Sequence, residues 1–153
     1  GEGQRQMQTW LTHGEAIPPD QLSMARQVSD LVVFDFLTSN PDRYSGGNMK
    51  MSPDGSELFY MDNTMSFFLD PLGKEKIRDV LFRTQRFSRS LVDALSRITE
   101  ATLRRALGAE AGAGHEILTP DEISAVIARR DAIKRYIGEL TAKYGAREVL
   151  FFP

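Results

Sequence analysis

The chain has 153 residues, of which 41% are hydrophobic and 26% are charged. This is an ordinary globular composition, in a length typical of one domain that can bury a core. The formal net charge of −2 gives no bulk attraction to nucleic acid or to an anionic membrane. The absence of cysteine excludes disulfides and thiolate metal sites, and no apolar stretch reaches the roughly 18–20 residues of a membrane span.

Charge is unevenly distributed along the chain. Residues 1–70 carry 10 acidic and 4 basic side chains, whereas residues 74–105 carry 4 acidic and 9 basic ones. The carboxylates of the first segment either hold cations or belong to a solvated surface of mixed sign, and for most of them we favour the surface. The arginines of the second segment fall on several helix faces and are expected to be mostly exposed. The chain begins with glycine rather than methionine, so we expect the natural protein to extend further at this end.

Residues 1–19 are mostly polar and end in two consecutive prolines, so we expect a loop or a short helix there. From Asp20 onward, apolar side chains recur at helical spacing, and residues 31–37 are apolar on nearly every side. This pattern predicts a helix whose last two turns are buried in the centre of the domain. We expect it to end at residues 39–41, because Pro41 cannot continue a helix and restricts the residue before it.

Two short strands are expected next, at residues 49–51 and 57–61. They are joined by Pro53, Asp54 and Gly55. A Pro-Asp-Gly turn between apolar runs favours a β-hairpin, because proline presets φ and glycine accepts a positive φ.

The second half of the chain is predicted to be helical. We expect helices at about 74–83, 87–98 and 99–108, followed by a Gly/Ala-rich linker at 108–114. An apolar tail at residues 149–152 is expected to dock on the body of the domain.

The last helix is the best marked. Thr119, Pro120 and Glu122 occupy the N-cap, N1 and N3 positions of a capping box. Apolar side chains then recur at helical spacing as far as Tyr144, and Gly145 supplies the stop. The predicted fold is therefore mainly α with one small β-hairpin.

Three side chains stand at the open end of the predicted hairpin. Asp42 and Asn48 flank a glycine-bearing loop between the buried helix and the first strand, and Asp62 closes the second strand. Because a hairpin brings the residues at its open end together, Asn48 and Asp62 should be neighbours. Asp42 follows the rigid end of the buried helix and should lie next to both. The sequence thus predicts that two carboxylates and an amide oxygen lie together at the open end of the hairpin.

Such a set suits phosphoryl transfer. Hard oxygen ligands bind Mg²⁺ (or Mn²⁺), which shares its coordination shell with substrate phosphates. A carboxylate held apart from the metal can orient an attacking hydroxyl and accept its proton. Taken singly, Asp42 would more often cap a turn, Asn48 begin a strand, and Asp62 sit in a strand-end turn. Taken together and in this order, they favour the functional interpretation.

Arg43 follows Asp42 directly and has two possible roles. It can contact a phosphate, or it can fix the loop by pairing with a buried carboxylate such as Asp35. We favour the structural role.

Residues 31–43, followed by Phe59-Tyr60-Met61-Asp62-Asn63, resemble the catalytic segment of the four-jointed secretory-pathway kinases. That atypical group is also similar to the HipA kinases and, more remotely, to the phosphoinositide kinases. The resemblance implies that Asp42 is the catalytic aspartate and that Asn48 and Asp62 are the metal ligands. It covers roughly residues 10–145 and is specific only over residues 31–63.

The resemblance also implies a fold: one kinase-like C-terminal lobe spanning residues 1–153. Its parts would be the N-terminal segment (1–19), the catalytic helix, loop and hairpin (20–70), the helical part (74–145) and the tail (146–153). Two features depart from the family. Asn48 lies six residues after Asp42 instead of the usual five, and no glycine-rich strand pair or lysine–glutamate pair precedes the catalytic segment. An N-lobe that grips ATP is therefore expected to be absent.

The resulting expectation is the catalytic-lobe fragment of an ATP- and Mg²⁺-dependent kinase-like phosphotransferase, inactive without an N-lobe. Asp42 would be the base, Asp62 the principal metal ligand and Asn48 the second. The phosphate acceptor stays open among a protein hydroxyl, a small molecule and a lipid headgroup. The alternative is a non-catalytic, pseudokinase-type binding module whose partner surface is formed by the Gly/Ala linker and the last helix.

Overall fold

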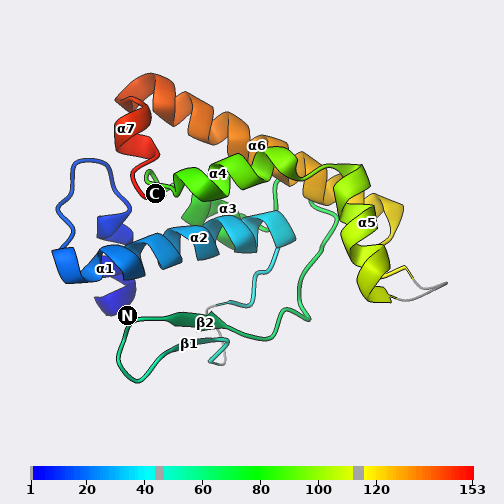
Figure 1. Cartoon of the computed structure of the whole chain (residues 1–153), viewed down its shortest axis with the longest axis horizontal. Helices are drawn as coiled ribbons and strands as arrows, with labels where there is room; N and C mark the ends of the chain where they lie inside the picture. The colour runs from blue at the N-terminus through cyan, green and yellow to red at the C-terminus, as the bar shows by residue number, and fades with distance from the viewer. Residues whose placement is uncertain (1, 44–46, 112–115) are drawn as a thin grey trace.

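The computed structural model describes residues 2–43, 47–111 and 116–153. The chain is mainly helical with one two-stranded antiparallel hairpin, which confirms the coarse fold class (Figure 1). Within the described residues, no helix combines the length and the apolar character that crossing a bilayer requires.

The N-terminal part forms α1 (Glu2–Trp10), a single 3₁₀ turn η1 (Pro19–Gln21) and α2 (Leu22–Thr38). The polar first segment therefore contains a helix, one of the two structures expected for it. The helix expected from Asp20 begins as the 3₁₀ turn and continues as α2.

The C-terminal half of α2 is buried, as predicted. Val32, Val33 and Phe36 are each no more than 3% exposed. The helix ends where Ser39 adopts a left-handed backbone with φ of 53°, shortly before Pro41. The predicted stop is therefore correct, and the left-handed residue gives it a defined geometry.

The hairpin consists of β1 (Met49–Met51) and β2 (Leu58–Tyr60), with Lys50 opposite Phe59. The second strand is one residue shorter at each end than expected. The turn follows the predicted chemistry, because Gly55 takes a φ of 73° that a side chain would disfavour.

The three helices expected in the next stretch are α3 (Glu75–Leu81), α4 (Arg89–Arg97) and α5 (Glu100–Ala111). α5 runs past Gly108, because the alanines and the glutamate that follow are strong helix formers and offset the cost of one glycine. The linker expected at 108–114 is therefore wrong over residues 108–111, and its remainder lies outside the described residues.

The capping box of α6 (Pro120–Tyr144) is formed as predicted. Thr119 Oγ1 accepts the backbone N–H of Glu122 at 3.2 Å, and the Glu122 carboxylate accepts the backbone N–H of Thr119 at 2.7 Å. The helix ends at Gly145, which has a φ of 89°. A further single-turn helix, α7 (Ala146–Val149), was not expected.

The apolar tail docks on the body of the domain, as predicted. Val149 is fully buried and Phe152 is 3% exposed. Phe152 also forms a parallel β-bridge with Ser88, immediately before α4. The C-terminus is therefore tied to the helical part by backbone hydrogen bonds as well as by burial.

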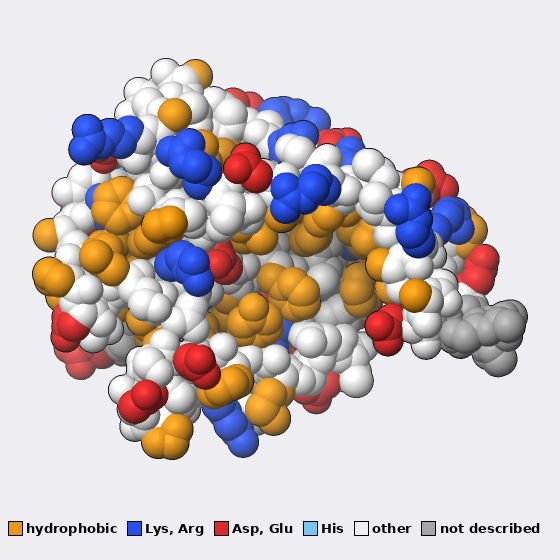
Figure 2. Space-filling view, in the orientation of Figure 1, with side chains coloured by type: hydrophobic (Ala, Val, Ile, Leu, Met, Phe, Trp, Pro, Cys, Tyr) orange, Lys and Arg blue, Asp and Glu red, His pale blue; other side chains and the backbone are white. Residues whose placement is uncertain are grey.

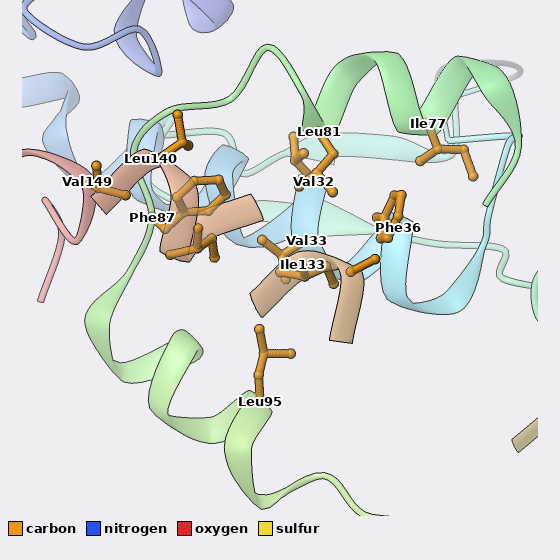
Figure 3. Packing of buried hydrophobic residues seen from close by; sticks show 12 residues of the cluster. Val32, Val33, Phe36, Ile77, Leu81, Phe87, Leu95, Ile133, Leu140 and Val149 are labelled. Atoms are coloured by element: carbon orange, nitrogen blue, oxygen red, sulfur yellow. The ribbon is translucent and has the colours of Figure 1, made fainter. Parts of the chain in front are cut away.

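The main core is built around α2 (Figure 3). Side chains from α3, α4, α6, α7 and the segment before α4 pack against it, and those labelled in Figure 3 are Val32, Val33, Phe36, Ile77, Leu81, Phe87, Leu95, Ile133, Leu140 and Val149. Because α2 is packed against several elements, the loop that follows it starts from a fixed position.

Three arginines of the described chain are buried: Arg43, which belongs to the candidate site, Arg86 and Arg129. Arg86 is an exception in the stretch whose arginines were expected to be mostly exposed: it is 3% exposed and donates from Nη1 to the backbone oxygen of Trp10 at 3.0 Å. Arg129 of α6 is fully buried, and it donates to the backbone oxygens of Leu37 at 2.8 Å and Phe68 at 2.7 Å. Arg129 thus joins α6 to the end of α2 and to the segment after the hairpin.

Candidate functional site

Arg43 is the structural centre of the candidate site. It is 1% exposed, and its Nε and Nη2 atoms donate to Oδ1 of Asp35 at 3.0 and 2.9 Å. Its Nη1 donates to the backbone oxygens of Asn48 at 3.2 Å and Met61 at 2.8 Å. One side chain therefore fastens the loop after Asp42 to α2 and to both strands of the hairpin. The structural role that we favoured for Arg43 is confirmed.

Two asparagines extend this network. Asn63 Oδ1 accepts hydrogen bonds from Arg43 Nη2 at 2.6 Å and from Asn40 Nδ2 at 3.3 Å. Asn40 Oδ1 in turn accepts the backbone N–H of Asp42 at 3.0 Å. The backbone of Asp42 is thereby linked to the residue that follows Asp62. Sequence reasoning had given neither asparagine a role, although each adjoins the predicted motif.

The structure brings the side chains of Asp42 and Asn48 together. Asn48 Nδ2 donates to the backbone oxygen of Asp42 at 3.0 Å and to its Oδ2 at 3.1 Å. Both residues are partly buried. Because both bonds use the amide nitrogen, Oδ1 is the atom with which Asn48 can act as a cation ligand.

Asp62 lies at the open end of the hairpin. Its predecessor Met61 donates its backbone N–H to the oxygen of Asn48 at 2.8 Å, so the hairpin geometry expected for these positions is present. Asp62 has a φ of 52°, a left-handed conformation that aspartate tolerates better than most residues. Its Oδ1 accepts from Thr64 Oγ1 at 2.6 Å and from the Thr64 backbone N–H at 3.2 Å.

These hydrogen bonds favour the ionised form of Asp62. The bonds from Thr64, with a smaller contribution from the positive charge of Arg43, lower the pKa of the exposed Asp62 carboxyl. Asp62 is therefore ionised at neutral pH, which a cation ligand requires. Burial has the opposite effect on Asp35: desolvation outweighs the Arg43 hydrogen bonds and raises the Asp35 pKa to about 6.

The site thus contains one direct side-chain pair and one residue linked indirectly. Asp42 and Asn48 contact each other, whereas Asp62 is connected to them through Arg43 and the strand pairing. In the part of the chain that the structure describes, no three or more His, Cys, Asp or Glu side chains form a metal-binding group. The predicted set contains only two carboxylates, so a cation held by it would take further oxygens from phosphate and water.

No protein-family model matches this chain, and no curated protein sequence matches it. The chemistry proposed for the site therefore rests on the residues and contacts described above.

Proposed function

We propose that this chain is the catalytic-lobe part of an ATP- and Mg²⁺-dependent kinase-like phosphotransferase. The observation that carries the proposal is the hydrogen bond between the side chains of Asp42 and Asn48, next to the strand pairing that joins Asn48 to Met61. It couples the candidate base to the residue before β1, while Asp62 follows β2 at the same open end of the hairpin. The resemblance to the four-jointed kinases assigns the same three residues the same roles.

Each residue has a distinct task in this proposal. Asp62 is the principal ligand of Mg²⁺ or Mn²⁺, because its carboxylate is exposed and ionised. Asn48 is the second ligand through Oδ1. The metal ion, when bound, neutralises charge on the ATP phosphates.

Asp42 is the general base. The acceptor hydroxyl oxygen bonds to the γ-phosphorus of ATP, the bond to the β-phosphate oxygen breaks, and ADP leaves. The proton of the hydroxyl passes to the Asp42 carboxylate. A protein side chain, a small molecule and a lipid headgroup can each supply such a hydroxyl, so the acceptor stays open at the level of a hydroxyl group.

Arg43 supports this chemistry without touching the substrate. Each of its N–H groups donates to an acceptor of the protein itself. It therefore holds the loop and the hairpin in register and leaves no donor for a phosphate.

The alternative function is a non-catalytic binding module, and one observation favours it. Exposed large hydrophobic side chains are concentrated in the hairpin and the segment after it, namely Met51, Phe59, Tyr60, Met61, Met65, Leu69 and Leu72. Figure 2 shows hydrophobic side chains both in the hollowed centre of this face and along its lower edge, over the hairpin. Exposed apolar side chains gathered in one part of a chain often mark an interaction site.

Calorimetric titration with Mg²⁺ and ADP separates the two functions. It should be made on the longest natural form that contains these residues, with Asp62→Asn as the test variant. Asp54→Asn is the matched control, because Asp54 is an exposed carboxylate at the opposite end of the same hairpin and is likewise held by hydroxyl groups. The proposal expects metal-dependent ADP binding that Asp62→Asn weakens at least tenfold and Asp54→Asn leaves unchanged. Equal ADP binding by the wild type and Asp62→Asn would refute the ligand assignment, and no binding at all would favour the module.

A further inference from the structure

A pocket of about 340 Å³ lies behind the candidate site, between α1, α2, the end of α3 and the start of β1. Met7 of α1, Leu31 of α2, Val80 of α3 and Met49 of β1 contribute to its walls. Asn48 also lines it, so the pocket adjoins the loop that carries the candidate metal ligand. Its volume falls at the lower end of the range found for small-molecule sites.

The pocket exists because three hydrophobic clusters meet there without filling the space between them. The main core reaches it through Val32 and Val80. The cluster around Trp10 reaches it through Met7. The cluster around Leu31 reaches it through Met49. The pocket is partly open to solvent and its lining is mainly apolar, which is typical of small-molecule sites.

Among the described residues, the polar side chains of the wall are those of Gln8, Arg43, Asn48 and Thr84, and they restrict the chemistry of an occupant. Arg43 lines the pocket, but all of its N–H groups donate to protein acceptors, so it offers no donor to a ligand. Among the described residues that line the pocket, Arg43 is the only one with a charged side chain. Thr84 donates from Oγ1 to the backbone oxygen of Val80 at 3.0 Å, which leaves the hydroxyl oxygen as an acceptor.

A charged ligand would therefore lose water contacts without gaining a hydrogen bond from a charged side chain of the wall, which is costly. An uncharged apolar ligand does not have this cost, and its binding is favoured by the removal of apolar surface from water. A single N–H or O–H group on such a ligand can donate to Thr84.

We propose that this pocket binds an uncharged, mainly apolar small molecule, about the size of a fused two-ring aromatic with one substituent, that carries one hydrogen-bond donor. The site is distinct from the candidate cation site and does not depend on phosphotransferase activity. Asn48 lines the pocket and also belongs to the candidate cation site. An occupant of the pocket would therefore contact the loop that positions Asn48.

The test uses N-phenyl-1-naphthylamine, an uncharged aromatic amine whose fluorescence rises in apolar surroundings. The wild-type chain is expected to bind it saturably, with one molecule per chain. Anilinonaphthalene sulfonate has the same ring system and should bind at least tenfold more weakly, because Arg43 has no N–H group left to donate to its sulfonate. Equal binding of the two probes would overturn the preference for an uncharged ligand.

Variants locate the binding. Val80→Phe fills the pocket from α3 and is expected to weaken binding of the amine at least tenfold, whereas Leu72→Phe changes an exposed apolar residue outside it and should have no effect. Met7→Trp fills the pocket from the opposite wall. It replaces Val80→Phe in the test if circular dichroism shows that Val80→Phe is not folded. Undiminished binding by a folded filling variant, or no saturable binding by the wild type, would overturn the proposal.

Discussion

Arg43 and Asp35 form an ion pair whose side chains are only 1% and 2% exposed, with Nη2 at 2.9 Å from Oδ1. Asp35 belongs to α2, and Arg43 follows the candidate base. The pair therefore connects α2, whose C-terminal half is buried in the main core, to the loop that carries Asp42. The same guanidinium bonds to the backbone of both strands.

Arg43→Ala should destabilise the fold strongly. Removing one partner of a buried pair leaves the other charge uncompensated, which costs about 3–5 kcal/mol. Arg104→Ala removes one partner of the exposed ion pair with Glu100 and should lower stability by less than about 1 kcal/mol. Urea unfolding measures both free energies. Similar losses for the two variants would show that Arg43 is not the structural centre of the loop.

Asp35 should make stability depend on pH. Its pKa is raised to about 6 by burial, against 3.8 for an unperturbed aspartate, so between these values the folded chain binds the Asp35 proton more tightly than the unfolded chain does. The stabilisation contributed by this proton is complete below pH 3.8 and is lost as the pH rises through about 6. We therefore expect the stability advantage of the wild type over Asp35→Asn to shrink between pH 4 and about 6. Chemical unfolding across this range measures it, and a constant or growing advantage would contradict the shift.

Thr64 should lower the pKa of the Asp62 carboxyl. Thr64→Val removes the hydroxyl that bonds to the carboxylate at 2.6 Å, so the pKa of Asp62 should rise towards the ordinary aspartate value. A carboxyl ¹³C NMR titration measures the pKa of Asp62 directly. Thr102→Val, which alters a threonine at the start of α5, serves as the control and should leave the Asp62 titration unchanged. An unaltered Asp62 titration in Thr64→Val would argue against this hydrogen bond.

Thr119→Ala should cost about 1 kcal/mol of stability, because it removes the N-cap acceptor of α6. Thr9→Ala is the comparison: its hydroxyl only donates to a carbonyl within α1, so a smaller effect is expected. Thermal unfolding compares the two. Equal losses would mean that the capping box contributes nothing beyond an ordinary surface hydroxyl.

Local sequence signals predicted the elements that they control directly. Thr119 and Glu122 marked the start of α6, and the Pro-Asp-Gly turn marked the hairpin, because caps and turns depend on a few neighbouring residues. α7 escaped prediction, since a single turn is too short to show a periodic pattern. The end of α5 was misplaced because one glycine was given more weight than the helix formers around it.

The candidate site was predictable only in part, for the same physical reason. Chain order and hairpin geometry predicted that Asn48 and Asp62 lie at the open end of the hairpin, and the strand pairing agrees with this. The hydrogen bonds donated by Arg43 depend on contacts between segments far apart in the chain. The burial of Arg86 and Arg129 depends on such contacts as well. A charged residue in a sequence is usually exposed, so only tertiary packing reveals these exceptions.

The most direct test of the central claim is paramagnetic broadening by Mn²⁺. Manganese added in small amounts to the ¹⁵N-labelled chain should broaden the amide signals of Asp42, Asn48 and Asp62 together, because the proposed function places the three residues around one cation site. Asp62→Asn should abolish this common broadening, and Asp54→Asn should preserve it. If Mn²⁺ broadens Asp54 as strongly as Asp62 and leaves Asp42 sharp, the three residues do not form one cation site.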